Sequence, residues 1–335
     1  MKFNQVFGAP AYAVASFALL GPASAVAGTY TYTTLDPPGQ TSSRAYGIND
    51  KDEVTGTSSA GTFVWSKGVF TTLPTIGGST TTPQAINAKG LLTGVYTPSG
   101  AYNNAEFTFK VANGKLTTPK LPANDNFVVQ GINIAGTVVG YTARTKSAPS
   151  FLINGRTVTW LTAPETYSFA EARAINDAGT VAGDYHGTDH HYHGYIEQGG
   201  TYTSFDAPGA TNTYTTFITN DGVVGGYWFT AGGTESGYTI NGGTATSFSY
   251  PGSNSSIVAG VDAAGVVAGY YSSGDSGQAF VWIGGTYYNI NVPGATDTNI
   301  IGINSKGSLV GIYTDSAGNH AYIAQCPSGQ SPCTQ

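Results

Sequence analysis

The sequence predicts an all-β protein, a seven-bladed β-propeller of four-stranded blades, on three observations. A short sequence motif recurs seven times along the 335-residue chain. Its copies are about 43 residues apart, a period typical of propeller blades. The composition, with 47 Gly, 22 Tyr and 10% charged residues, favours strands and turns over helices. The first copy begins with a lone strand and the last copy lacks one, as expected for a closed ring.

Residues 1–27 have the features of a signal peptide that is removed from the folded protein. Lys2 gives a positive start, residues 11–20 are apolar, and small residues at 23–27 predict cleavage after Ala25 or Ala27. The apolar run is too short to span a bilayer comfortably, and no later segment is apolar enough to do so. We therefore expect a secreted or periplasmic protein without a membrane span after signal cleavage.

Residues 28–39 have the sequence of the fourth strand of the repeat, without the three strands that precede it elsewhere. The final copy, 301–325, has three strands and no fourth. If the opening strand completes the last blade, no sheet edge is left exposed at the junction of the two ends. This predicts one domain over 28–325, closed by its N-terminal strand.

Each copy is anchored by an apolar residue on its first strand, followed in most copies by Asn and a turn that contains Gly. The second strand ends in Gly, and the third carries a small residue followed by an aromatic one, as in Gly194-Tyr195. A hairpin signal such as Gly199-Gly200 precedes the fourth strand, which often ends in Pro-Gly. The seven anchors are Ile48, Ile86, Ile132, Ile175, Ile218, Val261 and Ile303.

The C-terminal tail, residues 326–335, holds both cysteines of the chain, Cys326 and Cys333. An exported protein meets an oxidising compartment, so these two are predicted to form a disulfide. The bond would close a short loop and tie down the tail.

The repeat resembles that of the HAF-repeat family of predicted extracellular bacterial proteins. The resemblance covers nearly all of residues 28–325 and is carried by three motifs: Ala-Ile-Asn-Asp-Ala-Gly-Thr-Val-Ala-Gly at 174–183, His193-Gly194-Tyr195 with His320-Ala321-Tyr322, and Asp-Ala-Pro-Gly-Ala-Thr at 206–211. Five copies have no His at the position of His193, which departs from the family's name motif. The resemblance implies a fold and an extracellular setting, and little about chemistry.

The segment 184–193 is a candidate metal site in the loop between the second and third strands of its copy. It contains four of the five histidines of the chain, beside Asp184 and Asp189. Imidazole and carboxylate groups suit a divalent transition metal. The alternative is a solvated polar loop, in which His193 is an ordinary blade residue. The candidate metal ligands are His186, Asp189, His190 and His191.

The mouth of the central channel is a second candidate, because a few charged residues interrupt an otherwise neutral repeat near the starts of the first strands. A polar ring there could hold a sugar or an acidic group, with Arg for carboxylates and Tyr for stacking. The alternative is an Arg–Glu pair that seals the mouth. The candidate ligand-binding residues are Arg44, Glu171, Arg173 and Tyr214, with Asp184 and His186 from the adjacent loop.

Composition excludes some functions and favours others. The net charge is -6 with 13 Lys and Arg in all, so we expect no nucleic-acid partner. Even repetition, few ionisable groups and many Tyr and Thr favour a monomeric, non-catalytic binding or scaffold module for glycans or extracellular proteins. The alternative is a propeller enzyme, a polysaccharide lyase or hydrolase, acting at the face with the candidate residues.

Overall fold

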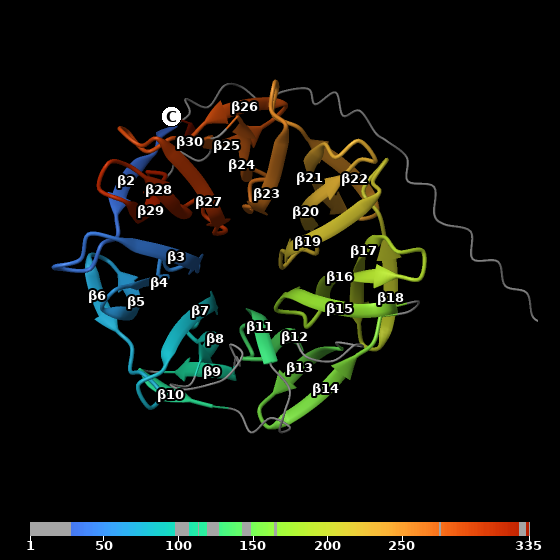
Figure 1. The fold of residues 1–335 in the computed structure, drawn as a ribbon, viewed down its shortest axis with the longest axis horizontal. Helices are drawn as coiled ribbons and strands as arrows, with labels where there is room; N and C mark the ends of the chain where they lie inside the picture. The colour runs from blue at the N-terminus through green and yellow to red at the C-terminus, as the bar shows by residue number, and fades with distance from the viewer. Residues whose placement is uncertain are drawn as a thin grey trace, which may run out of the picture.

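The chain forms a ring of seven four-stranded antiparallel sheets around a central channel, which confirms the predicted seven-bladed β-propeller (Figure 1). This computed structural model describes residues 28–97, 107–112, 114–118, 127–142, 149–163, 166–274, 276–327 and 333–334. The predicted signal peptide, 1–27, lies outside these ranges. Within them the regular structure is all β, and no helix is long and apolar enough to cross a membrane.

Every blade has the same strand order from the channel outward. The innermost strands are β3 (Ser43–Ile48), β7 (Thr80–Ile86), β11 (Phe127–Ile132), β15 (Thr166–Ile175), β19 (Asn212–Ile218), β23 (Ser255–Val261) and β27 (Asp297–Ile303). The second strands are β4 (Val54–Ser58), β8 (Leu92–Thr97), β12 (Val138–Thr142), β16 (Val181–Gly187), β20 (Val224–Phe229), β24 (Val267–Ser273) and β28 (Leu309–Thr314).

The outer half of each blade follows in the same way. The third strands are β5 (Gly61–Ser66), β9 (Phe107–Ala112), β13 (Ser150–Asn154), β17 (Tyr192–Gln198), β21 (Glu235–Asn241), β25 (Ser276–Ile283) and β29 (Asn319–Gln325). The outermost strands are β6 (Val69–Thr72), β10 (Lys115–Thr117), β14 (Thr157–Leu161), β18 (Thr201–Phe205), β22 (Thr244–Phe248), β26 (Thr286–Asn289) and β2 (Thr31–Thr34). Blades 1–7 are numbered from the one that begins with β3.

The ring closes through its N-terminal strand, as the sequence predicts. Strand β2 pairs antiparallel with β29, from Thr31 opposite Gln325 to Thr34 opposite Tyr322. The Leu35 amide extends this ladder by donating to the Ala321 carbonyl at 2.8 Å. Blade 7 is thus assembled from both ends of the described chain, and its outer edge is paired.

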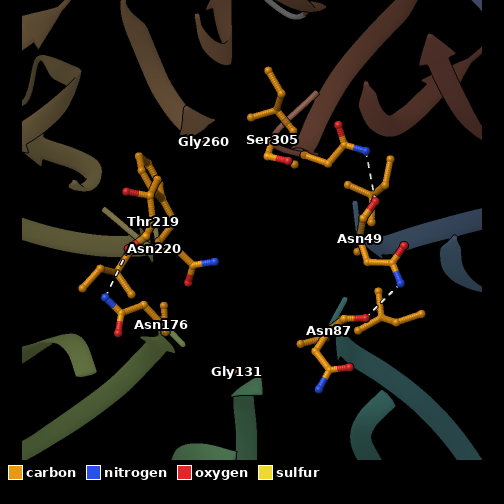
Figure 2. A pocket seen from close by; sticks show the side chains of 18 of the residues that line it. Asn49, Asn87, Gly131, Asn176, Thr219, Asn220, Gly260 and Ser305 are labelled. Carbon is orange, nitrogen blue, oxygen red and sulfur yellow. Dashed lines mark hydrogen bonds between the residues drawn. The ribbon is translucent and has the colours of Figure 1, made fainter. Parts of the chain in front are cut away.

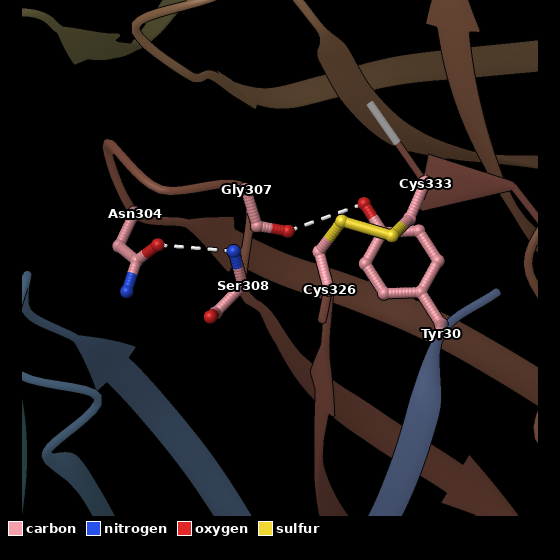
Figure 3. Close-up of a disulfide and its surroundings, with 6 residues drawn as sticks. All are labelled: Tyr30, Asn304, Gly307, Ser308, Cys326 and Cys333. Carbon is pink, nitrogen blue, oxygen red and sulfur yellow. Dashed lines mark hydrogen bonds between the residues drawn. A yellow bond between two sulfur atoms is a disulfide. The ribbon is translucent and has the colours of Figure 1, made fainter. Parts of the chain in front are cut away.

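The C-terminal tail adds a second contact at the same junction, which the sequence did not indicate. Strand β30 (Cys333–Thr334) pairs in parallel with β1 (Gly28–Thr29). The predicted disulfide between Cys326 and Cys333 is present, and Cys333 is 1% exposed in a core cluster shared by blades 6 and 7 (Figure 3). Nearby, the Tyr30 hydroxyl donates to the Gly307 carbonyl at 3.1 Å. Residues 333–334 therefore pack against the strands that close the ring.

The repeated glycine and aromatic residue are explained by packing within each blade. On the second strand, a Cβ at Gly140 would lie 2.0 Å from the Val128 carbonyl oxygen and 2.9 Å from the Phe151 ring. Equivalent contacts occur at Gly56 and Gly183, whose Cβ atoms would meet the rings of Phe63 and Tyr195. The third-strand ring thus occupies the space that a side chain would fill, and only glycine permits this. The third-strand rings that are fully buried are Phe63, Phe151, Tyr195, Tyr238, Phe280 and Tyr322.

Candidate functional site

The central channel is lined by the second halves of all seven innermost strands and by the turns that follow them. These residues enclose a cavity of about 630 Å³ (Figure 2). Each innermost strand has a register shift near its end, and the extra residue lies on the cavity wall. The seven extra residues are Tyr46, Gln84, Gln130, Arg173, Thr216, Ala259 and Ile301, so Arg173 supplies the one charge among them.

A circle of asparagine side chains links the blades around this end of the channel. Within its own turn, the Asn49 side-chain oxygen accepts from the Lys51 and Glu53 amides, an Asx turn. The side-chain amide of each asparagine also donates to the main-chain carbonyl of the equivalent residue in the next blade (Figure 2). These bonds run from Asn49 to Asn87 (2.9 Å), Asn87 to Asn133 (2.7 Å), Asn133 to Asn176 (3.3 Å), Asn176 to Thr219 (3.2 Å) and Asn304 to Asn49 (3.0 Å).

Three charged side chains cluster where blade 4 meets blade 5, and we call Glu171, Arg173 and Asp184 the charged cluster. Glu171 and Asp184 lie opposite each other on β15 and β16. The Arg173 guanidinium forms an ion pair with Glu171 and donates from Nε to Asp184 Oδ1 at 3.1 Å. The Arg–Glu pair anticipated from the sequence is therefore present, and a second carboxylate shares it.

Asp184 is the most deeply buried member of the charged cluster, with a side chain that is 1% exposed. Burial raises the pKa of its carboxyl to about 6, although the adjacent Arg173 acts in the opposite direction. Its Oδ1 also accepts from the Thr215 amide of blade 5 at 3.4 Å, while Oδ2 has no hydrogen-bond partner among the described residues. The charged cluster is thus anchored across the boundary between two blades.

Six half-buried rings adjoin the charged cluster and form a continuous band over blades 4 and 5, which we call the aromatic band. The Tyr192 ring lies 5.1 Å from His186 and 4.7 Å from Tyr214, which joins the two blades. Tyr214 stacks on Tyr227 at 5.0 Å with an interplanar angle of 16°. The members are Phe169, His186, Tyr192, Tyr214, Tyr227 and Phe229, all partly exposed.

The histidine-rich segment is a strand hairpin and not the loop expected from the sequence. Strand β16 runs to Gly187 and β17 starts at Tyr192, so only four residues turn between them. The turn is closed by the Gly187 amide, which donates to the His191 carbonyl at 2.8 Å, and His190 has a φ of 69°. His186 consequently lies on a strand within the aromatic band, where its Nδ1 is 2.8 Å from the Ser168 hydroxyl.

The candidate metal ligands do not come together as a set. Asp189 binds the His193 ring through Nε2 at 3.0 Å, while His190 and His191 lie in the exposed turn. Across the residues that the structure describes, no three His, Cys, Asp or Glu side chains are placed to hold a metal ion. Asp189 is bound to His193 and His186 to Ser168, so these two side chains are directed to separate partners and not to a shared ion.

His193 is held between two carboxylates, and the same arrangement recurs in blade 7; we call each a histidine clamp. His193 contacts Asp206 through Nδ1 at 2.9 Å and Asp189 through Nε2 at 3.0 Å. His320 contacts Asp36 through Nδ1 at 2.7 Å and Asp315 through Nε2 at 3.2 Å. The structure therefore gives His193 the blade role that the sequence offered as the alternative to metal binding.

Of the residues predicted to ring the channel mouth, the structure joins Glu171, Arg173 and Tyr214 but leaves Arg44 apart. Arg44 is an exposed residue of β3 in blade 1, three blades away from β15 (Figure 1). The cavity also lies toward the turns after the innermost strands, whereas the prediction favoured the opposite face. Equivalent positions in a seven-fold ring are spread around the circle, so repeat alignment alone does not bring them together.

Most of the aromatic band, and the donor role of the turn asparagines, were not predicted from the sequence. Phe229 had a signal, since the other copies have Ser, Thr, Ala or His at its position near the end of the second strand. For the asparagines the signal was their identity: an Asx turn needs only an acceptor, yet five of seven copies use Asn. The Tyr192–Tyr214 contact and the asparagine bonds join different blades and have no local pattern.

Comparison with known proteins identifies the fold and nothing finer. No protein-family model and no curated protein matches this sequence. Among solved structures, a puromycin-hydrolysing peptidase of Mycobacterium tuberculosis has a TM-score of 0.57 at 12% identity, covering 90% of this chain and 55% of that one. A prolyl endopeptidase has a TM-score of 0.54 at 10% identity, and this chain spans only 47% of its length.

Two other similar structures match this chain over almost their whole length. The β-propeller domain of the Trilobed protease from Pyrococcus furiosus, described as having an open velcro topology, has a TM-score of 0.56 at 9% identity, with 86% of this chain and 99% of that chain covered. YCF48 from Cyanidioschyzon merolae has a TM-score of 0.54 at 11% identity, with 89% and 99% covered. At such low sequence identity, the structural similarity establishes the propeller fold alone.

Proposed function

We propose that this chain is a secreted, non-catalytic binding module that recognises glycans through the aromatic band. The observation that carries the proposal is the unbroken run of six partly exposed rings across blades 4 and 5. Sugar rings have apolar C–H faces that pack on aromatic side chains, and their hydroxyls need polar partners nearby. Here the tyrosine hydroxyls would supply those partners, together with Arg173 and Glu171, which are partly exposed.

A secreted setting is supported by the disulfide, because such bonds persist in oxidising compartments. It is also supported by the signal peptide predicted over residues 1–27 and by the resemblance of the repeat to HAF-repeat proteins. Propellers serve as binding scaffolds and as parts of enzymes, so the fold by itself decides neither.

Binding without catalysis fits the charged cluster better than polysaccharide cleavage does. A pair of carboxylates with one raised pKa is a feature of glycoside hydrolases, and Asp184 beside Glu171 has that chemistry. However, Asp184 is buried beneath the surface and both carboxylates are bound by Arg173. The glycosidic bond of a substrate would not reach the Asp184 oxygens without a rearrangement of this cluster.

The test is a glycan and polysaccharide panel measured for binding and cleavage with the wild type and the Tyr214→Ala variant. Tyr214 contacts three other rings of the band, so its removal should weaken glycan binding at least about tenfold. The matched control is Tyr288→Ala, since Tyr288 is a 37% exposed tyrosine on β26, outside the band. This control should bind as the wild type does.

Tyr192→Ala serves as a second variant in case Tyr214→Ala does not fold. Glycan binding that survives in both band variants, or that is lost equally in Tyr288→Ala, would refute the proposal. Cleavage of any panel member by the wild type would instead support the enzyme alternative.

A further inference from the structure

Blades 4 and 5 hold an excess of negative charge that the rest of the chain does not share. Residues 166–248 contain no Lys and a single Arg, Arg173, and His193 is a second cation because Asp206 and Asp189, outweighing burial, raise its pKa to about 9. The acidic residues in the same range are Glu171, Asp177, Asp184, Asp189, Glu197, Asp206, Asp221 and Glu235. The aromatic band therefore lies on the most acidic part of the ring.

Several of these carboxylates border the aromatic band directly. Glu171 and Asp184 lie on the same strands as Phe169 and His186, and Glu235 on β21 is the cross-strand partner of Phe229. Arg173 balances only one charge of the Glu171–Asp184 pair, and Asp184 Oδ2 has no hydrogen-bond partner in the described part of the chain. Glu235 accepts from the Ser255 hydroxyl and has no described ion-pair partner.

The tyrosine hydroxyls of the aromatic band lie in the electrostatic field of these carboxylates. Burial raises the pKa of the Tyr192 and Tyr227 hydroxyls, and nearby carboxylates, Asp184 among them, raise it further, while Arg173 acts in the opposite direction. The same two causes, together with neighbouring tyrosines, raise the pKa of Tyr214. A negative potential over electron-rich ring faces is the combination that attracts cations.

We propose that the ligand of the aromatic band is a cationic glycan, a polymer of amino sugars whose amines are protonated. This inference rests on the proposed glycan-binding function and specifies the class of sugar. A protonated amine can lie over a tyrosine face while a bordering carboxylate neutralises it. An acidic sugar, considered from the sequence because of Arg173, is disfavoured because both carboxylates of the charged cluster already bind that guanidinium.

The experiment compares glucosamine oligomers with N-acetylglucosamine oligomers of equal length, at a pH where the free amine is protonated. The two differ in charge and share the sugar ring, so their affinity ratio isolates the electrostatic contribution. We expect glucosamine oligomers to bind about tenfold more tightly at low salt, and the ratio to shrink as salt increases. Glu235→Gln should reduce the ratio several-fold, because it removes one bordering charge and keeps the side-chain shape.

The matched control is Glu53→Gln on blade 1, a carboxylate far from the band that also accepts a side-chain hydrogen bond. It should leave the ratio unchanged. Equal or tighter binding of the acetylated oligomers, with loss in Tyr214→Ala, would overturn the cationic preference and leave the proposed function standing. Absence of binding to either oligomer and to the whole glycan panel would overturn both. Tighter binding of lysine oligomers than of glucosamine oligomers would also overturn the inference, because it would identify a basic peptide as the ligand.

Discussion

Asparagine, at the turn after five of the seven innermost strands, does two things that no other side chain combines at that position. Its oxygen closes the local turn, and its amide group donates to the next blade. Asp and Thr can close the turn but lack the second donor. Where the copies have Thr219 and Asp262, the circle of inter-blade amide bonds is accordingly interrupted.

The buried carboxylate of Asp262 lowers the stability of the folded protein, whereas the neutral asparagines at the equivalent positions do not. Its Oδ1 accepts from the Ala264 and Val266 amides, while Oδ2 is buried with no hydrogen-bond partner among the described residues. Burial raises the pKa of this carboxyl above its usual value of 3.8. The charged form is therefore disfavoured in the folded protein, and the penalty is present at neutral pH.

We predict that Asp262→Asn stabilises the protein at neutral pH by about 1 kcal/mol, because the new amide can donate to the Asn304 carbonyl. As pH falls through the raised pKa, the wild-type carboxyl takes up a proton and the penalty disappears. The advantage of the variant should therefore shrink in acid. Denaturant unfolding at neutral and acidic pH measures both effects.

The control for this prediction is Asp221→Asn, which removes the same charge from an exposed position on the neighbouring turn. Its free energy of unfolding should stay within about 0.5 kcal/mol of the wild type. A destabilised Asp262→Asn variant, or an advantage that grows in acid, would show that the new side chain does not donate to the Asn304 carbonyl.

At the scale of single elements, the third and fourth strands of a blade are joined by a side-chain pair whose chemistry varies between copies. Blade 4 uses His193 with Asp206, and blade 7 uses His320 with Asp36. Blade 6 uses a neutral pair, in which the Asn291 amide donates to Gln278 at 2.6 Å. The same position thus holds an ion pair in two blades and a neutral pair in another.

The histidine clamps stabilise the folded protein while their histidines are protonated, so part of its stability is lost at alkaline pH. Asp206 and Asp189, outweighing burial, raise the pKa of His193 from 6.5 to about 9. Since the folded state binds the proton more tightly, this stabilisation is complete below pH 6.5 and is lost as pH rises through 9. In blade 7, burial alone would lower the pKa of His320, but Asp36 and Asp315 raise it overall.

We predict that the double variant His193→Gln/Asp206→Asn, which copies the neutral pair of blade 6, loses less thermal stability between pH 7 and pH 10 than the wild type. Melting curves at the two pH values provide the measurement. The difference between the proteins isolates the blade 4 clamp, because His320 and the tyrosines titrate in both. An equal fall in Tm for both proteins would mean that His193 does not titrate as its contacts indicate.

At the scale of the whole molecule, stability depends on closing the ring, and the closure uses contacts of several kinds. Strand β2 completes blade 7, Leu35 is fully buried between blades 7 and 1, and Asp36 binds His320. The disulfide and the β1–β30 pair add to the same junction. Removing the N-terminal strand would therefore expose the edge of β29. It would also open the core cluster around Leu35, between blades 7 and 1.

We predict that a protein lacking residues 28–39 has a markedly lower Tm and aggregates, because loss of Leu35 alone removes about 2–5 kcal/mol and the β29 edge becomes free to pair with other chains. Thermal melting and light scattering measure the two effects. A protein ending at residue 325 is the control, since it loses β30 and the disulfide but keeps β2, and it should stay monomeric. A monomeric N-terminal deletion with unchanged melting would contradict this account of closure.

The sequence by itself determined the blade count, the strand order, the closure by the N-terminal strand and the disulfide. Each of these follows from local patterns that repeat: the glycine that admits a buried ring, the Asx turn, and the unmatched strands at the two ends. Tertiary structure alone decided the candidate site. The aromatic band, the hydrogen bond from Thr215 to Asp184 and the asparagine circle all join neighbouring blades. Tyr192 and Tyr214 are 22 positions apart in the sequence, and Asn49 and Asn87 are 38 positions apart. Which side chains face each other across blades depends on packing angles that no local pattern contains.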